Sequence, residues 1–318
     1  MLQQTQVATV VPYFERFLSA FPTIEALAEA PEEKVLGLWE GLGYYRRARQ
    51  LHRAAKTILR EHGGCFPHNR DAVLALPGIG RYTAGAVLSI ALDAREPILE
   101  ANTVRLYSRL LAYRGDPLSG KGQQQLWGFA ESVLPAKNVG EFNQALMELG
   151  SLTCTPREPN CDQCPVAVLC PTCAQGLQSA IPIARPRTKF ESVQEVCVVV
   201  RRDSRVLLRR CGSKERWAGL WDFPRFPFES DIQPSTALSR KLVANVRRLT
   251  GVTIVPGPEF TTIKHGVTRF RITLVCYQGS YKKGPLKDNR TRWVQTTRLS
   301  DYPLSATGRK IATSLQEE

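Results

Sequence analysis

The stretch from Leu76 to Gly85, LPGIGRYTAG, constrains the fold of this chain more than any other. Apolar runs with helical spacing precede and follow it. Pro77 ends the first helix, while Gly78 and Gly80 permit a tight turn with outward-pointing amides directly before a second helix. Exposed N–H groups beside a helix N-terminus suit a phosphate group. An ordinary glycine-capped turn between two helices would show the same pattern, and both interpretations stay open for this stretch alone.

Charge and length narrow the class of protein. The 318 residues are enough for two or three domains, and 43 Lys and Arg against 29 Asp and Glu give a net charge of +14. A strongly basic chain favours a polyanionic partner, with nucleic acid as the first candidate and a membrane surface as the alternative. No apolar run is long enough for a membrane span and no targeting segment is recognisable, so we expect an intracellular, soluble protein.

The first half of the chain is predicted to be all-α. Apolar spacing indicates helices through residues 1–62, interrupted at Gly41–Tyr45, and again over 70–92, 101–113, 122–134 and 139–152. Two tyrosines at the interruption stand directly before the basic run Arg46–Arg49. Planar rings beside guanidinium groups suit a nucleic-acid surface, although a solvated basic helix has the same pattern.

The second half reads as α+β. Residues 176–192 are rich in proline and basic residues and are predicted to be a linker. Runs typical of β-strands follow at 196–200, 206–208, 270–277 and 292–294, with a helical patch at 238–249.

A cysteine loop separates the two halves. Cys154, Cys161, Cys164 and Cys170 have the spacing C-x6-C-x2-C-x5-C, and Cys173 follows as a spare. Four thiolates in one short loop, without a nearby histidine, suit a [4Fe–4S] cluster. A zinc site with four cysteine ligands remains the alternative on spacing alone.

Several motifs in fixed order carry a family resemblance. MLQQTQV, LWEGLGYYRRARQLHRAA, LPGIGRYTAGAVLS, FNQALMELG and the cysteine loop together closely resemble the adenine DNA glycosylases of the MutY type, in the helix–hairpin–helix superfamily that includes endonuclease III. The resemblance is dense over residues 1–170. It is thinner over 193–318, where Gly219–Pro224 (GLWDFP) looks like the opening of a Nudix-like domain.

The resemblance implies a multidomain fold: an all-α helix–hairpin–helix glycosylase domain with a [4Fe–4S] cluster loop, followed by an α+β Nudix-like domain. We expect a truncated six-helix-barrel part at 1–97, an iron–sulfur domain at 98–175, the linker at 176–192 and a Nudix-like lesion-recognition domain at 193–318. The helical patch at 238–248 holds no acidic residue, so no Mg²⁺-dependent Nudix hydrolysis is expected.

The implied activity is hydrolytic removal of adenine mispaired with 8-oxoguanine, or guanine, in double-stranded DNA. The base is flipped out of the stack, and two carboxyl groups cleave the glycosidic bond. A monomer in the cytoplasm or at the nucleoid would fit this activity.

Site residues follow from the resemblance position by position. The hairpin residues Gly78, Ile79 and Gly80 match a DNA-phosphate clamp. Tyr82 stands where bifunctional relatives carry a nucleophilic lysine, and a phenol is a poor Schiff-base former, so no lyase step is expected. The remaining matches are Gln4 and Tyr44 as wedges in the DNA stack, Gln144 in the adenine pocket, Asn102 in the active site, and Cys154, Cys161, Cys164 and Cys170 as cluster ligands.

The chain departs from the family pattern at three places. The family's catalytic glutamate stands directly before the methionine that is Met1 here. Glu100 replaces the family's catalytic aspartate, and a displacement of about 1 Å can cost about a hundredfold in rate. In the lesion-contacting triplet, Thr268 keeps a hydroxyl while Arg269 replaces a histidine.

Either a late start codon or a decayed gene would explain the missing glutamate, and we favour the late start codon because the helices and cysteines remain well patterned. For the chain as written we expect little or no adenine excision but retained duplex binding. The alternative functions are a non-catalytic DNA- or lesion-binding protein and, disfavoured by Tyr82, a pyrimidine glycosylase of the endonuclease III type.

Overall fold

A computed structural model describes residues 1–3, 5–184, 189–228 and 236–317. The chain forms two compact units: Met1–Lys56 together with Thr188–Glu318, and Thr57–Arg187. The larger unit is therefore built from both ends of the chain. Gln4, one of the predicted DNA wedges, lies outside the described residues.

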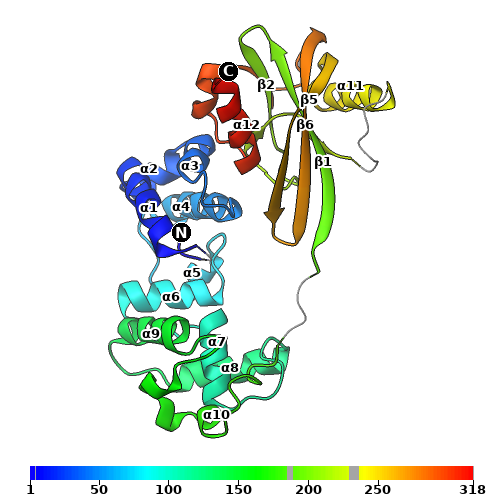
Figure 1. Ribbon diagram of the computed structural model, residues 1–318. Helices are drawn as coiled ribbons and strands as arrows, with labels where there is room; N and C mark the ends of the chain where they lie inside the picture. Colours follow the sequence, from blue (N-terminus) through cyan, green and yellow to red (C-terminus); the bar gives the residue numbers. More distant parts are fainter. Residues whose placement is uncertain (4, 185–188, 229–235, 318) are drawn as a thin grey trace. The chain divides into compact units, whose positions relative to one another are not determined.

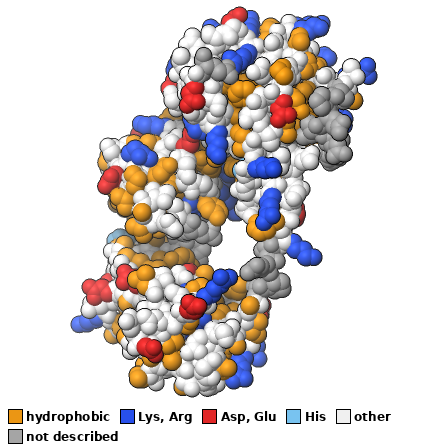
Figure 2. All heavy atoms as spheres, in the orientation of Figure 1, with side chains coloured by type: hydrophobic (Ala, Val, Ile, Leu, Met, Phe, Trp, Pro, Cys, Tyr) orange, Lys and Arg blue, Asp and Glu red, His pale blue; other side chains and the backbone are white. Residues whose placement is uncertain are grey.

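Helices make up the described N-terminal part of the larger unit: α1 (Val7–Ala20), α2 (Ile24–Glu29), α3 (Glu32–Leu38) and α4 (Arg46–His62). Val35 and Leu36 are fully buried, and the rings of Phe17 and Trp39 meet edge to face. The outer face of α1 instead exposes an apolar stripe, and hydrophobic side chains are visible over this region in Figure 2. The stripe comprises Val7, Val11, Phe14 and Leu18.

The remainder of the larger unit holds a mixed sheet with two helices. Its elements are β1 (Glu191–Arg202), β2 (Arg205–Arg210), β3 (Trp221–Asp222), β4 (Arg225–Pro227), α11 (Thr236–Thr250), β5 (Thr253–Val267), β6 (Phe270–Lys283), β7 (Thr291–Gln295) and α12 (Ala306–Gln316). The strand order is β3-β2-β1-β6-β5, with β4 paired to β1 and β7 to β2. Only β1 and β6 pair in parallel among the described strands.

The sheet is covered on both faces. One face packs Cys197, Val199 and Cys276 against α12, and the other packs Val196 and Val198 against α11. Figure 1 shows the two helices on opposite sides of the sheet. Alternate residues of β1 therefore enter different cores, as the pleat of a strand requires.

The N-terminal helices hold the sheet region through glutamates. Glu40 accepts hydrogen bonds from Arg309 (2.6 and 3.0 Å) and from the Leu304 N–H (3.1 Å). Glu33 accepts one from Trp221 Nε1 at 3.0 Å, and Glu32 pairs with Arg210 at 3.0 Å. These contacts join residues that are far apart in the chain.

The smaller unit is helical. It contains the end of α4, then α5 (Arg70–Ala75), α6 (Arg81–Leu92), α7 (Ala101–Leu110), α8 (Gly120–Ser132), α9 (Val139–Glu148), a π-helix (Leu149–Thr153) and α10 (Pro171–Ala174), with short 3₁₀ turns at Cys161–Gln163 and Ala167–Leu169. Helix α9 approaches α6 closely, since a Cβ on Gly140 would lie 2.6 Å from the Ser89 carbonyl oxygen. Asn143 fixes this contact by donating to Ser89 Oγ and the Glu96 carbonyl, both at 2.9 Å.

The predicted fold class, an all-α part followed by an α+β part, is confirmed. The elements β3, β4, β5 and α12 of the second half lie outside the predicted runs. Pro256, Gly257 and Pro258 interrupt the alternation in β5, and the strand accommodates them with register shifts between Pro256 and Thr261. Among the described helices, none is both long and apolar enough to cross a membrane.

Candidate active site and cysteine pocket

The hairpin between α5 and α6 has the predicted geometry. Asn69 caps α5 by accepting the Ala72 N–H at 2.9 Å, and Gly78 turns the chain with φ +81°. Gly80 is the N-cap of α6, and a Cβ there would meet open space. Within the described chain, the N–H groups of Gly78 and Gly80 have no hydrogen-bond acceptor, so these amides are available beside a helix N-terminus.

Tyr82 lies in the first turn of α6 and is half-buried. Its hydroxyl donates to Met147 Sδ of α9 at 3.5 Å. Burial raises the pKa of the Tyr82 phenol, and the nearby Glu100 carboxylate raises it further. Tyr82 is therefore a neutral hydrogen-bonding group close to Glu100.

Glu100 caps α7. Its Oε1 accepts the N–H of Asn102 (2.8 Å) and of Thr103 (2.9 Å), and Thr103 Oγ1 accepts the Glu100 N–H at 2.8 Å. This reciprocal capping box fixes the carboxylate at the positive end of the helix. The extra methylene of glutamate thus does not leave the group free to swing into solvent.

Asn102 connects this cap to the cysteine loop through Arg105. Arg105 donates to Asn102 Oδ1 at 3.0 Å, to the Gly150 carbonyl, and from Nε to the Cys154 carbonyl at 2.7 Å. Gly150, in the π-helix, lies so close that an added Cβ would be 2.9 Å from the Asn102 Cβ. One guanidinium therefore joins a predicted active-site residue to the backbone of a predicted cluster ligand.

The other predicted contact residues are surface groups. Gln144 on α9 is exposed, and its amide donates to the Gly140 carbonyl at 3.2 Å. Tyr44 is 52% exposed and has φ +49°, which is unusual for a residue with a Cβ. The Arg47 guanidinium lies 5.1 Å from the centre of its ring. An aromatic ring held outward in this way suits contact with a base.

Thr268 and Arg269 form the turn of the β5–β6 hairpin. Thr268 has φ +51°, and its hydroxyl donates to the Val267 carbonyl at 2.7 Å. Arg269 pairs with Glu191 at 3.2 Å, with both side chains more than half exposed. Neither side chain is built into a closed pocket.

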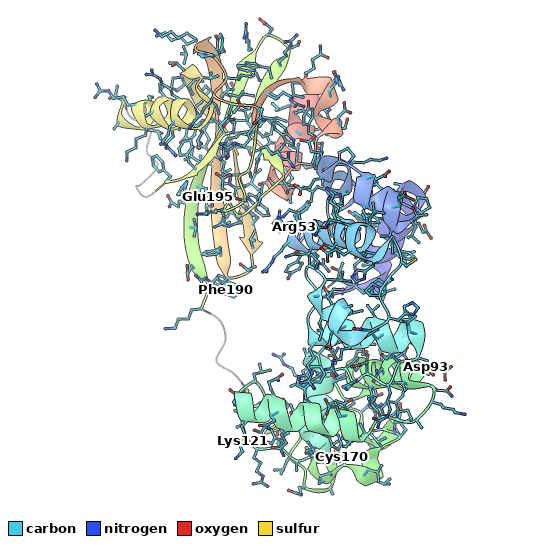
Figure 3. The ribbon with its side chains drawn as sticks, turned by 180° about the vertical axis from the view of Figure 1, so that it is seen from behind. Arg53, Asp93, Lys121, Cys170, Phe190 and Glu195 are labelled. Atoms are coloured by element: carbon cyan, nitrogen blue, oxygen red, sulfur yellow. The ribbon has the colours of Figure 1, made fainter. Side chains whose placement is uncertain are left out.

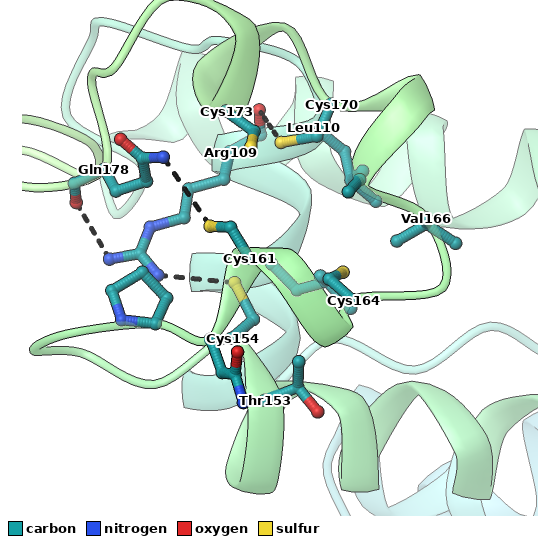
Figure 4. Close-up of a pocket in the computed structure, with 14 residues that line it drawn as sticks. Arg109, Leu110, Thr153, Cys154, Cys161, Cys164, Val166, Cys170, Cys173 and Gln178 are labelled. Atoms are coloured by element: carbon teal, nitrogen blue, oxygen red, sulfur yellow. Dashed lines mark hydrogen bonds between the residues drawn. The ribbon is translucent and has the colours of Figure 1, made fainter.

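Five cysteines line one pocket in the smaller unit (Figure 4). The lining includes Cys154, Cys161, Cys164, Cys170 and Cys173, with the apolar side chains Leu106, Leu110, Val166 and Ala167. Arg109 Nη1 donates to Cys154 Sγ at 3.3 Å, and Gln178 Nε2 donates to Cys161 Sγ at 3.5 Å. Donors aimed at two of the sulfurs stabilise negative charge there.

Arg109 organises this pocket. It is 2% exposed, and its guanidinium also donates to the carbonyls of Ile181 (2.9 Å), Thr155 (2.8 Å), Gln178 (2.8 Å) and Pro156 (3.4 Å). Its own carbonyl accepts the Thr172 hydroxyl at 2.6 Å. Sequence reasoning missed Arg105 and Arg109; the one available signal was two arginines four residues apart on the otherwise buried face of a predicted helix.

The spread of the thiols bears on the choice of metal. A zinc ion needs its ligand sulfurs at about 2.3 Å, which brings them close together. Within the described residues, no three His, Cys, Asp or Glu side chains are grouped tightly enough to hold one ion. Among the described residues, the pocket offers separated thiols with hydrogen-bond donors to sulfur and apolar walls.

Two parts of the chain match known domain families. Residues 1–132 match the HhH-GPD superfamily of base excision DNA repair proteins, and residues 195–314 match the NUDIX domain. An adenine DNA glycosylase of Buchnera aphidicola (subspecies Schizaphis graminum) is 37% identical over 226 residues, which are 71% of this chain and 65% of that protein. The adenine DNA glycosylase of Homo sapiens is 46% identical over 171 residues, 54% of this chain and 31% of that protein.

A solved structure of a thermostable thymine-DNA glycosylase is also similar. It has a TM-score of 0.51 and 29% identity, over 55% of this chain and 80% of that one. The chain spans less than two thirds of the two curated relatives described above.

Proposed function

We propose that the chain acts as an adenine DNA glycosylase on double-stranded DNA, because residues 1–132 match the HhH-GPD superfamily of base excision DNA repair proteins, residues 195–314 match the NUDIX domain, and its relatives include adenine DNA glycosylases. The observation that carries the proposal is the group formed by Glu100, Tyr82 and Asn102. It combines an anchored carboxylate with neutral hydrogen-bonding side chains, and no lysine stands at the position of Tyr82.

The chemistry assigned to these residues is hydrolytic. The Glu100 carboxylate faces the positive charge that develops on the deoxyribose as the glycosidic bond breaks, which stabilises an oxocarbenium-like sugar. Tyr82 holds the sugar region without forming a Schiff base, and Asn102 keeps the cap in place through Arg105. The hairpin amides at Gly78 and Gly80 hold a phosphate nearby.

We further propose that the base opposite the adenine is 8-oxoguanine, or guanine. Thr268 and Arg269, at the β5–β6 turn in the NUDIX domain, would contact this base. Their exposure supports this assignment, since an outward turn can reach a groove of the DNA. Tyr44 and Gln4 are proposed as residues that enter the stack.

A [4Fe–4S] cluster is the proposed cofactor. The four thiols of Cys154, Cys161, Cys164 and Cys170 would hold it, supported by the shared pocket and the donors from Arg109 and Gln178. When bound, such a cluster would tie together residues 154–170 and supply a redox-active group, and none of the roles assigned to Glu100, Tyr82 and Asn102 depends on it.

The test measures adenine release from an A·8-oxoguanine duplex under single-turnover conditions. The family's proton-donating glutamate precedes the methionine aligned with Met1, so the assay uses both the 318-residue chain and a longer chain extended at its N-terminus by a segment that carries this glutamate. In the longer chain, Glu100→Gln should lower the rate by at least about a hundredfold while duplex affinity stays within about threefold. Glu148→Gln, on the exposed surface of α9, is the matched control.

Two outcomes would count against the proposal. Excision that is unchanged in Glu100→Gln would remove the carboxylate from its assigned role. Tight duplex binding without any excision by the longer chain would leave a DNA- or lesion-binding protein as the function.

A further inference from the structure

The cysteine pocket holds one thiol more than a four-ligand cluster needs. Cys173 lies outside the C-x6-C-x2-C-x5-C spacing, yet its side chain lines the same pocket as the other four cysteines (Figure 4). Its thiol lies near those of Cys161, Cys170 and Cys164. Cys173 therefore stands beside the predicted ligand set, at the edge of the same pocket.

The backbone fixes Cys173 in this position. It belongs to α10, whose Thr172 side chain is fully buried and donates to the Arg109 carbonyl at 2.6 Å. The Cys173 carbonyl accepts the Gly176 N–H at 3.1 Å. A thiol held by a short, anchored helix remains close to Cys161 without a large rearrangement of the chain.

Cys161 borders two hollows. It lines the cysteine pocket and also a neighbouring surface hollow formed by Pro156–Asp162 with Gln178 and Ser179. Of the four predicted ligands, Cys161 is the one that lines this second hollow. Solvent in the second hollow therefore has access to Cys161.

We propose that Cys173 is a reserve ligand that replaces Cys161 when the bond between Cys161 and its iron is lost. The inference rests on the cluster assignment made under the proposed function. In the exchange, the Cys161 sulfur–iron bond breaks and a Cys173 sulfur–iron bond forms. The Cys173 proton passes to the departing Cys161 sulfur, so no oxidant or reductant is consumed.

The first experiment compares iron retention in purified full-length variants. Wild type, Cys173→Ala, Cys161→Ala, Cys161→Ala/Cys173→Ala and Cys154→Ala are reconstituted without oxygen, and iron, sulfide and absorbance near 400 nm are measured per chain. Wild type and Cys173→Ala should load equally. Cys161→Ala should keep at least half of the iron, whereas the double variant and Cys154→Ala should keep less than about a tenth.

The second experiment leaves all four predicted ligands intact and so avoids a folding defect. Wild-type protein, Cys173→Ala and the control Cys65→Ala, which removes an exposed thiol elsewhere, are incubated in air with an iron chelator. Iron release should be several-fold faster from Cys173→Ala than from the other two.

The outcomes separate the two proposals. A wild-type chain that binds no iron overturns both the cluster and the reserve ligand. A loaded wild type with equal iron loss from Cys161→Ala and the double variant, or equal release rates in air, overturns the reserve ligand alone.

Discussion

Buried arginines have different kinds of hydrogen-bond partner in the two units. In the smaller unit, Arg109 donates to four carbonyl groups and the Cys154 sulfur, and within the described chain no carboxylate pairs with it. In the larger unit, Arg225 donates to Glu195 and to Thr307 Oγ1 (2.9 Å), and lies 3.7 Å from Asp222. Arg216 also pairs with Glu195, at 2.6 Å.

The difference shows what each region is suited to hold. The Glu195 group balances two arginines with two carboxylates inside the sheet region (Figure 3), so its charges are already satisfied. The positive charge of Arg109 meets only dipoles and a thiol, so the cysteine pocket retains capacity for negative charge. The proposed cluster with thiolate ligands would supply that charge.

The largest effect is expected from Arg109→Met. The change leaves several carbonyl groups without a donor and removes the contact to Cys154, so the smaller unit should lose about 4 kcal/mol of stability or more. Hydrogen exchange across residues 101–181 measures this loss. Arg114→Met, at an exposed position, should change exchange very little; equal effects of the two substitutions would show that Arg109 does not organise the pocket.

Removing the Glu195 carboxylate in the larger unit should destabilise the protein somewhat less. Glu195→Gln leaves Arg225 and Arg216 without one of their carboxylate partners, and we expect the free energy of unfolding to fall by about 3 kcal/mol. Urea unfolding followed by the fluorescence of the buried Trp221 provides the measurement. Iron content should stay at the wild-type value, and a parallel loss of iron would contradict the separation of the two regions.

The surroundings of His265, beside Arg225 and Glu195, disfavour its protonation in the folded protein. Burial, followed by repulsion from Arg225, lowers the pKa of His265 below its ordinary value of 6.5, against an opposing influence of Glu195. The unfolded chain therefore takes up the proton first. The free energy of unfolding is therefore not reduced by His265 above pH 6.5, and it falls as the pH drops below that value. His265→Gln should flatten the pH dependence of urea unfolding between pH 7 and 5; an unchanged slope would assign the pH dependence elsewhere.

The smallest effect is expected at the exposed pair Glu191–Arg269. Both side chains are more than half exposed, so Glu191→Gln should change stability by less than about 0.5 kcal/mol. This substitution is on the same strand as Glu195 and serves as its control. A loss as large as that of Glu195→Gln would show that burial does not separate the two pairs.

Local chemistry made some features predictable. Pro77, Gly78 and Gly80 dictate a turn whatever surrounds them, and the structure has that turn. The four-cysteine spacing likewise marks a loop before any fold is known. The assignment of these residues to phosphate and cluster binding stays a prediction.

Other features depend on partners far away in the chain. Arg109 meets Gln178 and Ile181, and Glu195 meets Arg225, so neither residue carries a local signal of its burial. Cys173 was counted as spare because it breaks the spacing, while the anchoring of α10 by Thr172 turns it into the pocket. Cys197 and Cys276 are far apart in the chain and are neighbours in the β1–β6 pairing, so they too carry no local signal of their contact.

Because the larger unit contains both ends of the chain, it cannot finish folding until its C-terminal residues have been synthesised. Residues 57–187 form a unit as soon as they emerge, whereas helices α1 to α3 must wait for the sheet residues that bind Glu33 and Glu40. At roughly 5–20 residues per second, that delay is on the order of ten to fifty seconds. During this time the apolar faces of the first helices are uncovered, and a chaperone that recognises nascent chains would find its longest opportunity there.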